Sequence, residues 1–139
     1  MQNATPYKLL LTTFLFTLGF DQLTKEAAHL FGFEVTYNTG VSLRLLETVS
    51  VEALTAFLLM LVVLLWYWLL PYWHQNPVAG GLFFGGSISN ILDRIWYGAV
   101  RDWLPIPGLP IKNNLADVAL FAAVVMLFFV TSNTVKRKP

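Results

Sequence analysis

The sequence predicts an all-α membrane protein with four transmembrane helices and a small external β-hairpin, or cradle. Of its 139 residues, 56% are hydrophobic and only 12% are charged, whereas a soluble domain usually carries about 25% charged residues. The apolar residues form four stretches, at residues 6–25, 53–70, 77–97 and 115–132. Each approaches the roughly 20 residues that a helix needs to cross a bilayer core. The length suits one integral-membrane domain over residues 1–139.

Composition and charge argue against several classes of function. The formal net charge is +1 and no basic stripe is long enough to follow a phosphate backbone, so nucleic acid is not expected as a partner. The sequence contains no cysteine, which rules out disulfides and thiolate chemistry. His29 and His74 lie far apart in the sequence, and we therefore expect no metal site and no cofactor.

The first apolar stretch, residues 6–25, has the features of a retained helix. Thr5-Pro6 supplies an N-cap followed by proline at the first helical position. Lys8 invites a signal-peptide interpretation, but no small-residue cleavage site follows, and Asp21 and Lys25 continue the helix. We therefore expect a span that stays in the protein.

The other three stretches carry equally local signals. Residues 53–70 lack charge before Pro71 stops the helix, and they lead into an aromatic belt typical of a membrane interface: Trp66, Tyr67, Trp68, Tyr72 and Trp73. Residues 77–97 begin with Asn76-Pro77, again a cap and a first-turn proline, and are rich in small residues that allow close helix packing. Residues 115–132 carry one charge, Asp117.

Four spans place both termini on the same side of the membrane. Lys8 and the basic tail at residues 136–138 fall on that side, and the bias of Lys and Arg towards cytoplasmic segments assigns it to the cytoplasm. The external connections are then residues 26–52 and 98–114. Every acidic residue lies on, or just below, the external face. A polar site is therefore expected at that face.

The external connections are expected to be extended rather than helical. Residues 33–37 and 41–45 alternate between apolar and polar side chains around Asn38-Thr39-Gly40, which predicts a β-hairpin with its turn at these three residues. The proline-rich residues 105–110 predict an extended or turned segment.

Several polar residues have simple structural explanations. Asp21 and Lys25 are four apart with the acid first, which favours an ion pair on one helix face. Asn38 and Gly40 suit a hairpin turn, where both tolerate positive φ.

A second polar group has two interpretations that stay open. Asn90, Asp93 and Arg94 share a helix face, because they are three and four residues apart, and Gly86 continues that face. They form either a polar clamp between helices, with Arg94 neutralising Asp93, or a functional site.

Of the two aspartates near the fourth stretch, only Asp117 has a simple structural explanation. Asn114 and Asp117 fit a helix cap with an acid at the third helical position. Asp102 lies among apolar residues on the external side, and no helix accounts for it.

Taken in order, these motifs resemble the conserved blocks of the lipoprotein signal peptidases, the signal peptidase II family. The blocks are Asp21-x-x-x-Lys25, Asn38-x-Gly40, Gly85-Gly86 with Asn90-x-x-Asp93-Arg94, Val100-x-Asp102-Trp103 and Asn114-Leu115-Ala116-Asp117. They cover about residues 5–132. The resemblance implies a multi-pass aspartic peptidase of the bacterial inner membrane, acting as a monomer among membrane lipids, with its active site near the outer face.

By this resemblance, the enzyme removes the signal peptide from diacylglyceryl-modified bacterial prolipoproteins. Asp102 and Asp117 match the catalytic dyad. The positions that bind substrate or support the dyad are Asp21, Lys25, Asn38, Gly40, Asn90, Asp93, Arg94, Asn114 and Ala116. Leu43 and Asn113 depart from the family pattern, because both stand where phenylalanine is common.

Two neighbouring carboxylates that share one proton can supply both the base and the acid that peptide hydrolysis needs. Arg94 is suited to orienting a substrate carbonyl, because its guanidinium stays charged and presents several donors. One alternative is a serine peptidase that uses Ser87 or Ser89 with Lys25 as the base. Another is a membrane transport or structural protein, or a family member without activity, whose polar residues clamp helices.

Overall fold

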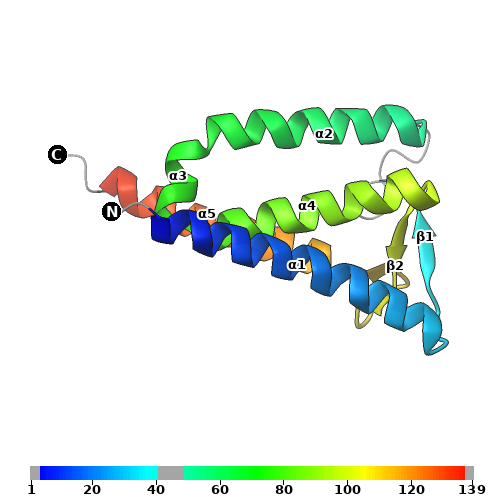
Figure 1. Ribbon diagram of the computed structural model, residues 1–139. Coiled ribbons are helices and arrows are strands. Elements are labelled where there is room, and N and C mark those ends of the chain that lie inside the picture. The colour runs from blue at the N-terminus through cyan, green and yellow to red at the C-terminus, as the bar shows by residue number, and fades with distance from the viewer. Residues whose placement is uncertain (1–3, 41–48, 137–139) are drawn as a thin grey trace.

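The computed structural model describes residues 4–40 and 49–136, which form helices and short antiparallel strands (Figure 1). The helices are α1 (Ala4–Leu30), α2 (Val51–Trp68), α3 (Leu70–Gln75), α4 (Pro77–Tyr97) and α5 (Leu115–Lys136). The strands are β1 (Thr36–Asn38), β2 (Val100–Asp102), β3 (Leu104–Pro105) and β4 (Lys112–Asn113). The mostly helical architecture that the sequence predicts is confirmed.

Helix α4 is the centre of the bundle, because it packs against α1, α2, α3 and α5. Figure 1 shows α1 and α5 running beside α4, while α2 lies to one side and joins the bundle through α3. The N-terminal end of α1 and the C-terminal end of α5 lie at one end of the bundle, and β1 and β2 lie at the opposite end. The segments predicted to carry the site are therefore gathered at one end.

Helix boundaries agree with the sequence where the capping signal is clear. Helix α4 spans the predicted residues 77–97, and the Asn76 side chain accepts a hydrogen bond from the N–H of Ala79 at 3.2 Å. The predicted cap at Thr5 is wrong, since α1 already includes this residue. Helix α2 ends at Trp68, before Pro71, and Pro71 is not the residue that stops it. Pro71 lies in the first turn of α3, where a missing N–H costs no hydrogen bond.

The strands form two small antiparallel sheets at the end of the bundle opposite the N-terminal end of α1 (Figure 1). Strand β1 pairs with β2, placing Thr36 opposite Asp102 and Asn38 opposite Val100. Strand β3 pairs with β4, and the proline-rich segment between them is extended and turned, as predicted. The predicted hairpin pairs residues 33–37 with residues 41–45. The second of these segments lies outside the described residues. The observed partner of β1 is a strand far along the chain, and local alternation cannot indicate such a partner.

Among the helices of the described ranges, only α2 is both long and apolar enough to cross a membrane, with a mean hydropathy of 2.0. The apolar part of α5, Leu115–Phe129, is shorter than a span of that kind. Helices α1 and α4 carry charged side chains within their length, including Lys25 and Asp93, which lowers their hydropathy. Length and composition thus support one of the four predicted spans directly.

The distribution of burial is the reverse of that in a soluble protein. Large apolar side chains point outwards, and Phe16 of α1 and Phe121 of α5 are 68% and 73% exposed. The charged side chains of Lys25 and Asp93 are fully buried. An outer surface of this kind suits lipid, because soluble monomers rarely expose large apolar patches.

Glycines of α4 allow the neighbouring helices to approach closely, as the small residues of this stretch predict. A Cβ atom at Gly85 would lie 2.8 Å from the carbonyl oxygen of Phe14 in α1. A Cβ atom at Gly86 would lie 2.6 Å from the carbonyl oxygen of Ala116 in α5. Both helices therefore contact α4 through backbone at these positions.

We predict that Gly85→Ala destabilises the protein by about 1–3 kcal/mol, because the new methyl group forces α1 away from α4. The measurement is thermal unfolding of the purified protein in detergent. Gly19→Ala is the matched control, since a Cβ atom there meets nothing within 4 Å. It should leave stability unchanged or raise it by up to about 1 kcal/mol through helix propensity. Equal effects of the two substitutions would contradict this packing.

Candidate active site

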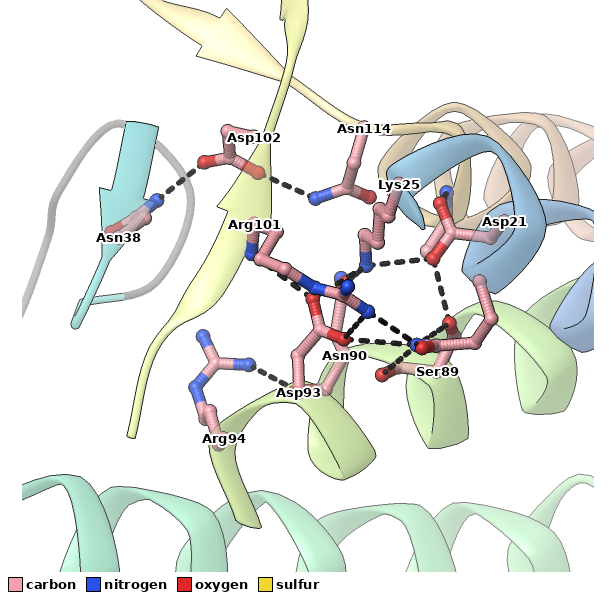
Figure 2. Close-up of polar contacts among 12 residues, drawn as sticks. Asp21, Lys25, Asn38, Ser89, Asn90, Asp93, Arg94, Arg101, Asp102 and Asn114 are labelled. Atoms are coloured by element: carbon pink, nitrogen blue, oxygen red, sulfur yellow. Dashed lines mark hydrogen bonds and ion pairs between the residues drawn. The ribbon is translucent and has the colours of Figure 1, made fainter. Parts of the chain in front are cut away.

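A cluster of buried charges joins α1 to α4 just below the strands (Figure 2). Lys25 Nζ lies 2.6 Å from Asp21 Oδ2 and 3.1 Å from Asp93 Oδ2. Asp21 is 1% exposed, and Lys25 and Asp93 are not exposed at all. The predicted ion pair of Asp21 and Lys25 is confirmed. One cation between two carboxylates leaves one negative charge, and buried charges of this kind need further partners.

The second cation on Asp93 is Arg101 of β2. The Arg101 backbone N–H donates to Asp93 Oδ2 at 3.0 Å, and its guanidinium donates to Asp93 Oδ1 at 2.9 Å. The interpretation in which Arg94 neutralises Asp93 is wrong, because Asp93 is paired with Lys25 and Arg101 instead. The sequence did not predict this role of Arg101. The signal that could have indicated it is a charged residue directly before Asp102 in an otherwise apolar segment.

Asp21 of α1 forms hydrogen bonds to both α4 and α5. Its Oδ2 accepts a hydrogen bond from Ser89 Oγ of α4 at 2.6 Å, in addition to the contact with Lys25. Its Oδ1 accepts from the backbone N–H of Ala116 at 2.8 Å, in the first turn of α5. Ala116 itself is fully buried. Asp21 therefore uses both oxygens, and it occupies the positive end of the α5 dipole.

Gln22 of α1 is a further member of this network that the sequence did not reveal. Its Nε2 donates to Ser89 Oγ at 2.8 Å and to Asp93 Oδ1 at 2.9 Å. Its Oε1 accepts from the Arg101 guanidinium at 2.8 Å. No charge or spacing motif marks a single glutamine at the end of an apolar helix.

Asn90 connects the buried charges to Asp117. Its side-chain oxygen accepts a hydrogen bond from Lys25 Nζ at 3.0 Å, so its amide nitrogen points the other way. That nitrogen donates to Asp117 Oδ1 at 2.7 Å. Because Lys25 fixes which way the Asn90 amide points, it also fixes the position of the donor that faces the Asp117 carboxylate.

Asp102 lies at the end of β2 and is 3% exposed. Its Oδ2 accepts from Asn38 Nδ2 at 3.1 Å, and its Oδ1 accepts from Asn114 Nδ2 at 2.6 Å (Figure 2). Both amides are held in this orientation, because Asn38 Oδ1 accepts from the Gly40 N–H and Asn114 Oδ1 accepts from the Asp117 N–H. Two donors therefore face the Asp102 carboxylate.

The protonation of Asp102 is set by opposing effects. Burial raises the pKa of the Asp102 carboxyl, and this effect exceeds the opposing one of the hydrogen bonds from Asn114 and Asn38. The positive charges of Lys25 and Arg94 also lower it, but the pKa remains above the usual value for aspartate. A carboxyl group in such a position can hold or release a proton nearer to neutral pH than an exposed aspartate can.

The cap at the start of α5 is made by Asn114 and not by the carboxylate of Asp117. Asn114 Oδ1 accepts from the Asp117 backbone N–H at 2.9 Å, which confirms the predicted N-cap. The N–H of Asn114 donates to Asn113 Oδ1, so the reciprocal bond of a capping box is made by another side chain. The Asp117 carboxylate is directed to Asn90 instead.

Arg94 holds the chain that follows β1. Its guanidinium donates to the carbonyl oxygen of Gly40 at 2.6 Å and to that of Asn90 at 3.2 Å. Gly40 is buried at this contact. Leu43, one of the two departures from the family pattern, lies outside the described residues. The other, Asn113, lies in β4 and accepts a hydrogen bond from the N–H of Trp103.

Two cavities border this cluster of side chains and share one lining residue, Asn38. The outer cavity, of about 330 Å³, is lined by both sheets and their loops: Glu34, Thr36, Asn38, Asp102, Pro105, Leu109, Pro110, Ile111 and Lys112. The inner cavity, of about 240 Å³, lies between α2, α4 and α5: Asn38, Leu58, Val62, Ser87, Asn90, Ile91, Arg94, Val100, Asp117 and Leu120. Asn38 lines both, with Asp102 on the outer cavity and Asp117 on the inner one.

The serine alternative finds little support in this geometry. Ser89 is fully buried, and its hydroxyl is bonded to Asp21 and Gln22. Lys25, its candidate base, is bonded to two carboxylates and an amide. Ser87 lines the inner cavity, whereas the polar contacts of Lys25 in the described part of the chain are to Asp21, Asp93 and Asn90. Within the described ranges, no group of three or more His, Asp or Glu residues is placed to hold a metal ion.

The structure thus brings all the predicted site residues into one connected region, at the end of the bundle that carries the strands. The family model of signal peptidase (SPase) II matches residues 8–132. The chain belongs to the signal peptidase II family. Signal peptidases are proteases, so family membership favours a protease over a transport protein.

Individual members of the signal peptidase II family give the same result. A lipoprotein signal peptidase of Nitrobacter hamburgensis is 36% identical over 110 residues, covering 71% of this chain and 67% of that protein. One of an Azoarcus species is 30% identical over 145 residues, covering 88% and 81%. A solved bacterial membrane enzyme matches with a TM-score of 0.71 at 21% identity, covering 93% of this chain and 91% of the other, and that likeness concerns the fold.

We predict that Asp102→Asn makes stability less sensitive to pH. Because the pKa of Asp102 is higher in the folded protein than the value of about 3.9 in an unfolded chain, the unfolded chain binds fewer protons between these two values. Wild-type stability is therefore lost as pH rises through that window, and the variant lacks this loss.

Thermal unfolding at about pH 4 and about pH 7.5 measures the effect. The Tm of the variant minus the Tm of wild type should be more positive at the higher pH. Any fixed cost of the amide at position 102 contributes equally at both pH values. A Tm difference that stays constant or decreases would contradict the raised pKa.

Proposed function

We propose that this protein is a membrane aspartic endopeptidase that removes the signal peptide from diacylglyceryl-modified bacterial prolipoproteins by water-mediated hydrolysis. The observation that carries the proposal is that Asp102 and Asp117 line two cavities that share Asn38 as a lining residue. Asn114 bridges the two residues, donating to the Asp102 carboxylate and accepting from the Asp117 N–H. Family membership supports the peptidase class and the prolipoprotein substrate.

The two aspartates divide the chemistry of hydrolysis. One carboxylate takes a proton from water as the water attacks the scissile carbonyl, and the other, protonated, gives its proton to the leaving nitrogen. Two carboxyl groups held in one site with limited access to water do not both ionise at neutral pH, so one proton is shared between them. No cofactor takes part in this sequence of steps.

The cavities suit the two parts of a lipid-modified substrate. Leu58, Val62 and Leu120 give the inner cavity an apolar wall between helices, suited to the lipid-modified residue and the signal helix. The outer cavity is lined by Glu34 and Lys112, which form an ion pair of 2.9 Å, and it suits the polar segment beyond the scissile bond.

Arg94 orients the substrate backbone at the inner cavity. Its terminal nitrogens bond the carbonyls of Gly40 and Asn90, while its buried Nε–H has no hydrogen-bond partner among the described residues. A substrate carbonyl at this position would satisfy that donor. Desolvated donors of this kind bind a carbonyl more strongly than donors in water do.

Helices α1, α2, α4 and α5 span the inner membrane as a monomer in contact with membrane lipids, with both termini in the cytoplasm and the site near the outer face. The exposed apolar surface of the bundle and its buried charges support this arrangement. A prolipoprotein anchored in the same bilayer then reaches the site by lateral diffusion.

We predict that Asp102→Asn, Asp117→Asn and the double variant all lose cleavage of a lipidated prolipoprotein peptide to similarly small residual rates, because residues that act as one unit are not additive. Asp117→Asn should remain folded, since Asn114 and the backbone N–H at position 117 make the helix cap. A folded single variant that cleaves within about tenfold of wild type, a loss of only about 1.4 kcal/mol, would refute the dyad.

Asp93→Asn is the contrasting control in the same assay. It leaves Lys25 and Arg101 without their shared carboxylate, and breaking a buried pair costs about 3–5 kcal/mol. Its main effect should therefore be a lower Tm, and the folded fraction should lose much less turnover than Asp102→Asn or Asp117→Asn does.

Topology gives a separate prediction. A reporter that is active only in the periplasm should give no signal when fused after Lys138, and a strong signal when inserted within residues 46–51. The basic residues near both termini are the reason, because such residues are retained in the cytoplasm. A strong signal from the C-terminal fusion would contradict the proposed orientation.

A further inference from the structure

Strand β2 presents Arg101 and Asp102 to opposite sides. Successive side chains of a strand point in opposite directions. The Asp102 carboxylate meets Asn38 and Asn114 at the outer cavity. The Arg101 side chain runs the other way, into the ends of α1 and α4 (Figure 2). Whatever holds Arg101 therefore sets the height and rotation of the strand that carries Asp102.

Arg101 is held at several points. Its backbone N–H and its guanidinium both bond Asp93, at 3.0 and 2.9 Å. The guanidinium also donates to Gln22 Oε1 at 2.8 Å and to Glu26 Oε2 at 3.1 Å, one turn apart on α1. It lies over the Tyr97 ring, 4.3 Å from the ring centroid. The Arg101 side chain is 5% exposed and Asp93 is fully buried, so this ion pair is shielded from water, whereas Glu26 is 54% exposed.

Arg101 also balances charge. Among the described residues, Lys25 would without Arg101 be left as the single cation that pairs with the two carboxylates of Asp21 and Asp93. Burial alone lowers the pKa of the Arg101 guanidinium, but the hydrogen bond and charge of Asp93 outweigh it and the pKa lies above its ordinary value. The planar fork of arginine suits contacts to several acceptors on two helices better than the point charge of lysine.

We propose that Arg101 is a positioning residue for Asp102. It anchors β2 to α1 and α4 through Asp93, and so holds the Asp102 carboxylate at the reaction centre. This inference rests on the proposed function, because it assigns Asp102 to the chemical step. Arg101 lines neither cavity, so it does not contribute to substrate affinity.

The expected signature is a loss in kcat without a change in KM. A displacement of about 1 Å at a catalytic group can cost about 100-fold in rate. Arg101→Met keeps much of the side-chain length and removes both the charge and the donors, so kcat should fall about 10- to 100-fold. Arg101→Lys keeps the charge opposite Asp93 but loses the fork, and kcat should fall by only about 3- to 10-fold.

The experiment measures kcat and KM of the full-length protein in detergent micelles with a lipidated prolipoprotein peptide, beside Tm. Lys8→Met is the matched control, since it removes an exposed cation on the same fold, at the other end of α1. It should leave kcat and KM within about twofold of wild type. The expected order of kcat is wild type, then Arg101→Lys, then Arg101→Met, at constant KM.

Several results would overturn the inference. A kcat for folded Arg101→Met within about twofold of wild type, a loss expressed in KM, or Arg101→Lys no better than Arg101→Met would each do so. If Arg101→Met is not recovered folded, Arg101→Lys decides, since a kcat equal to wild type contradicts positioning and a reduced kcat at constant KM supports it. Wild-type protein that does not cleave the peptide overturns the proposed function, and this inference with it.

Discussion

Lys25 lies between Asp21 and Asp93 without exposure to solvent, and the rest of the site depends on this three-charge cluster. Buried charges persist only when each finds partners, and one cation cannot neutralise two carboxylates. The missing partners come from different elements: Ser89 of α4 and the first turn of α5 donate to Asp21, and Arg101 of β2 pairs with Asp93. Satisfying these charges fixes α1, α4, α5 and β2 relative to one another.

Three side-chain amides connect this charge cluster to the two carboxylates proposed as the catalytic pair. Each amide has one end fixed by a backbone N–H or by Lys25, so its other end must donate towards an aspartate. Asn90 faces Asp117 in this way, and Asn38 and Asn114 face Asp102. Preorganised donors of this kind act strongly where water is scarce, and they need little rearrangement when substrate binds.

The sequence predicted what depends on local spacing. The bounds of α4, the Asn114 cap and the ion pair of Asp21 and Lys25 follow from residues at most four apart. It failed where the tertiary fold brings different elements together: β1 pairs with β2, and Arg101 of β2 bonds Asp93 of α4. Pairing Asp93 with Arg94 was wrong because adjacent helix positions do not face each other. The motif order indicated the site as a whole, although no single motif did so.

The pH dependence of kcat/KM for a lipidated prolipoprotein peptide tests the central claim most directly, namely that Asp102 and Asp117 act as a pair sharing one proton. A pair of carboxyl groups that shares one proton should give a bell-shaped profile. Activity falls at low pH when the base is protonated, and it falls again at higher pH when the second carboxyl loses its proton. A profile that rises to a plateau and stays there through about pH 9, as expected of a serine nucleophile with a lysine base, would contradict it.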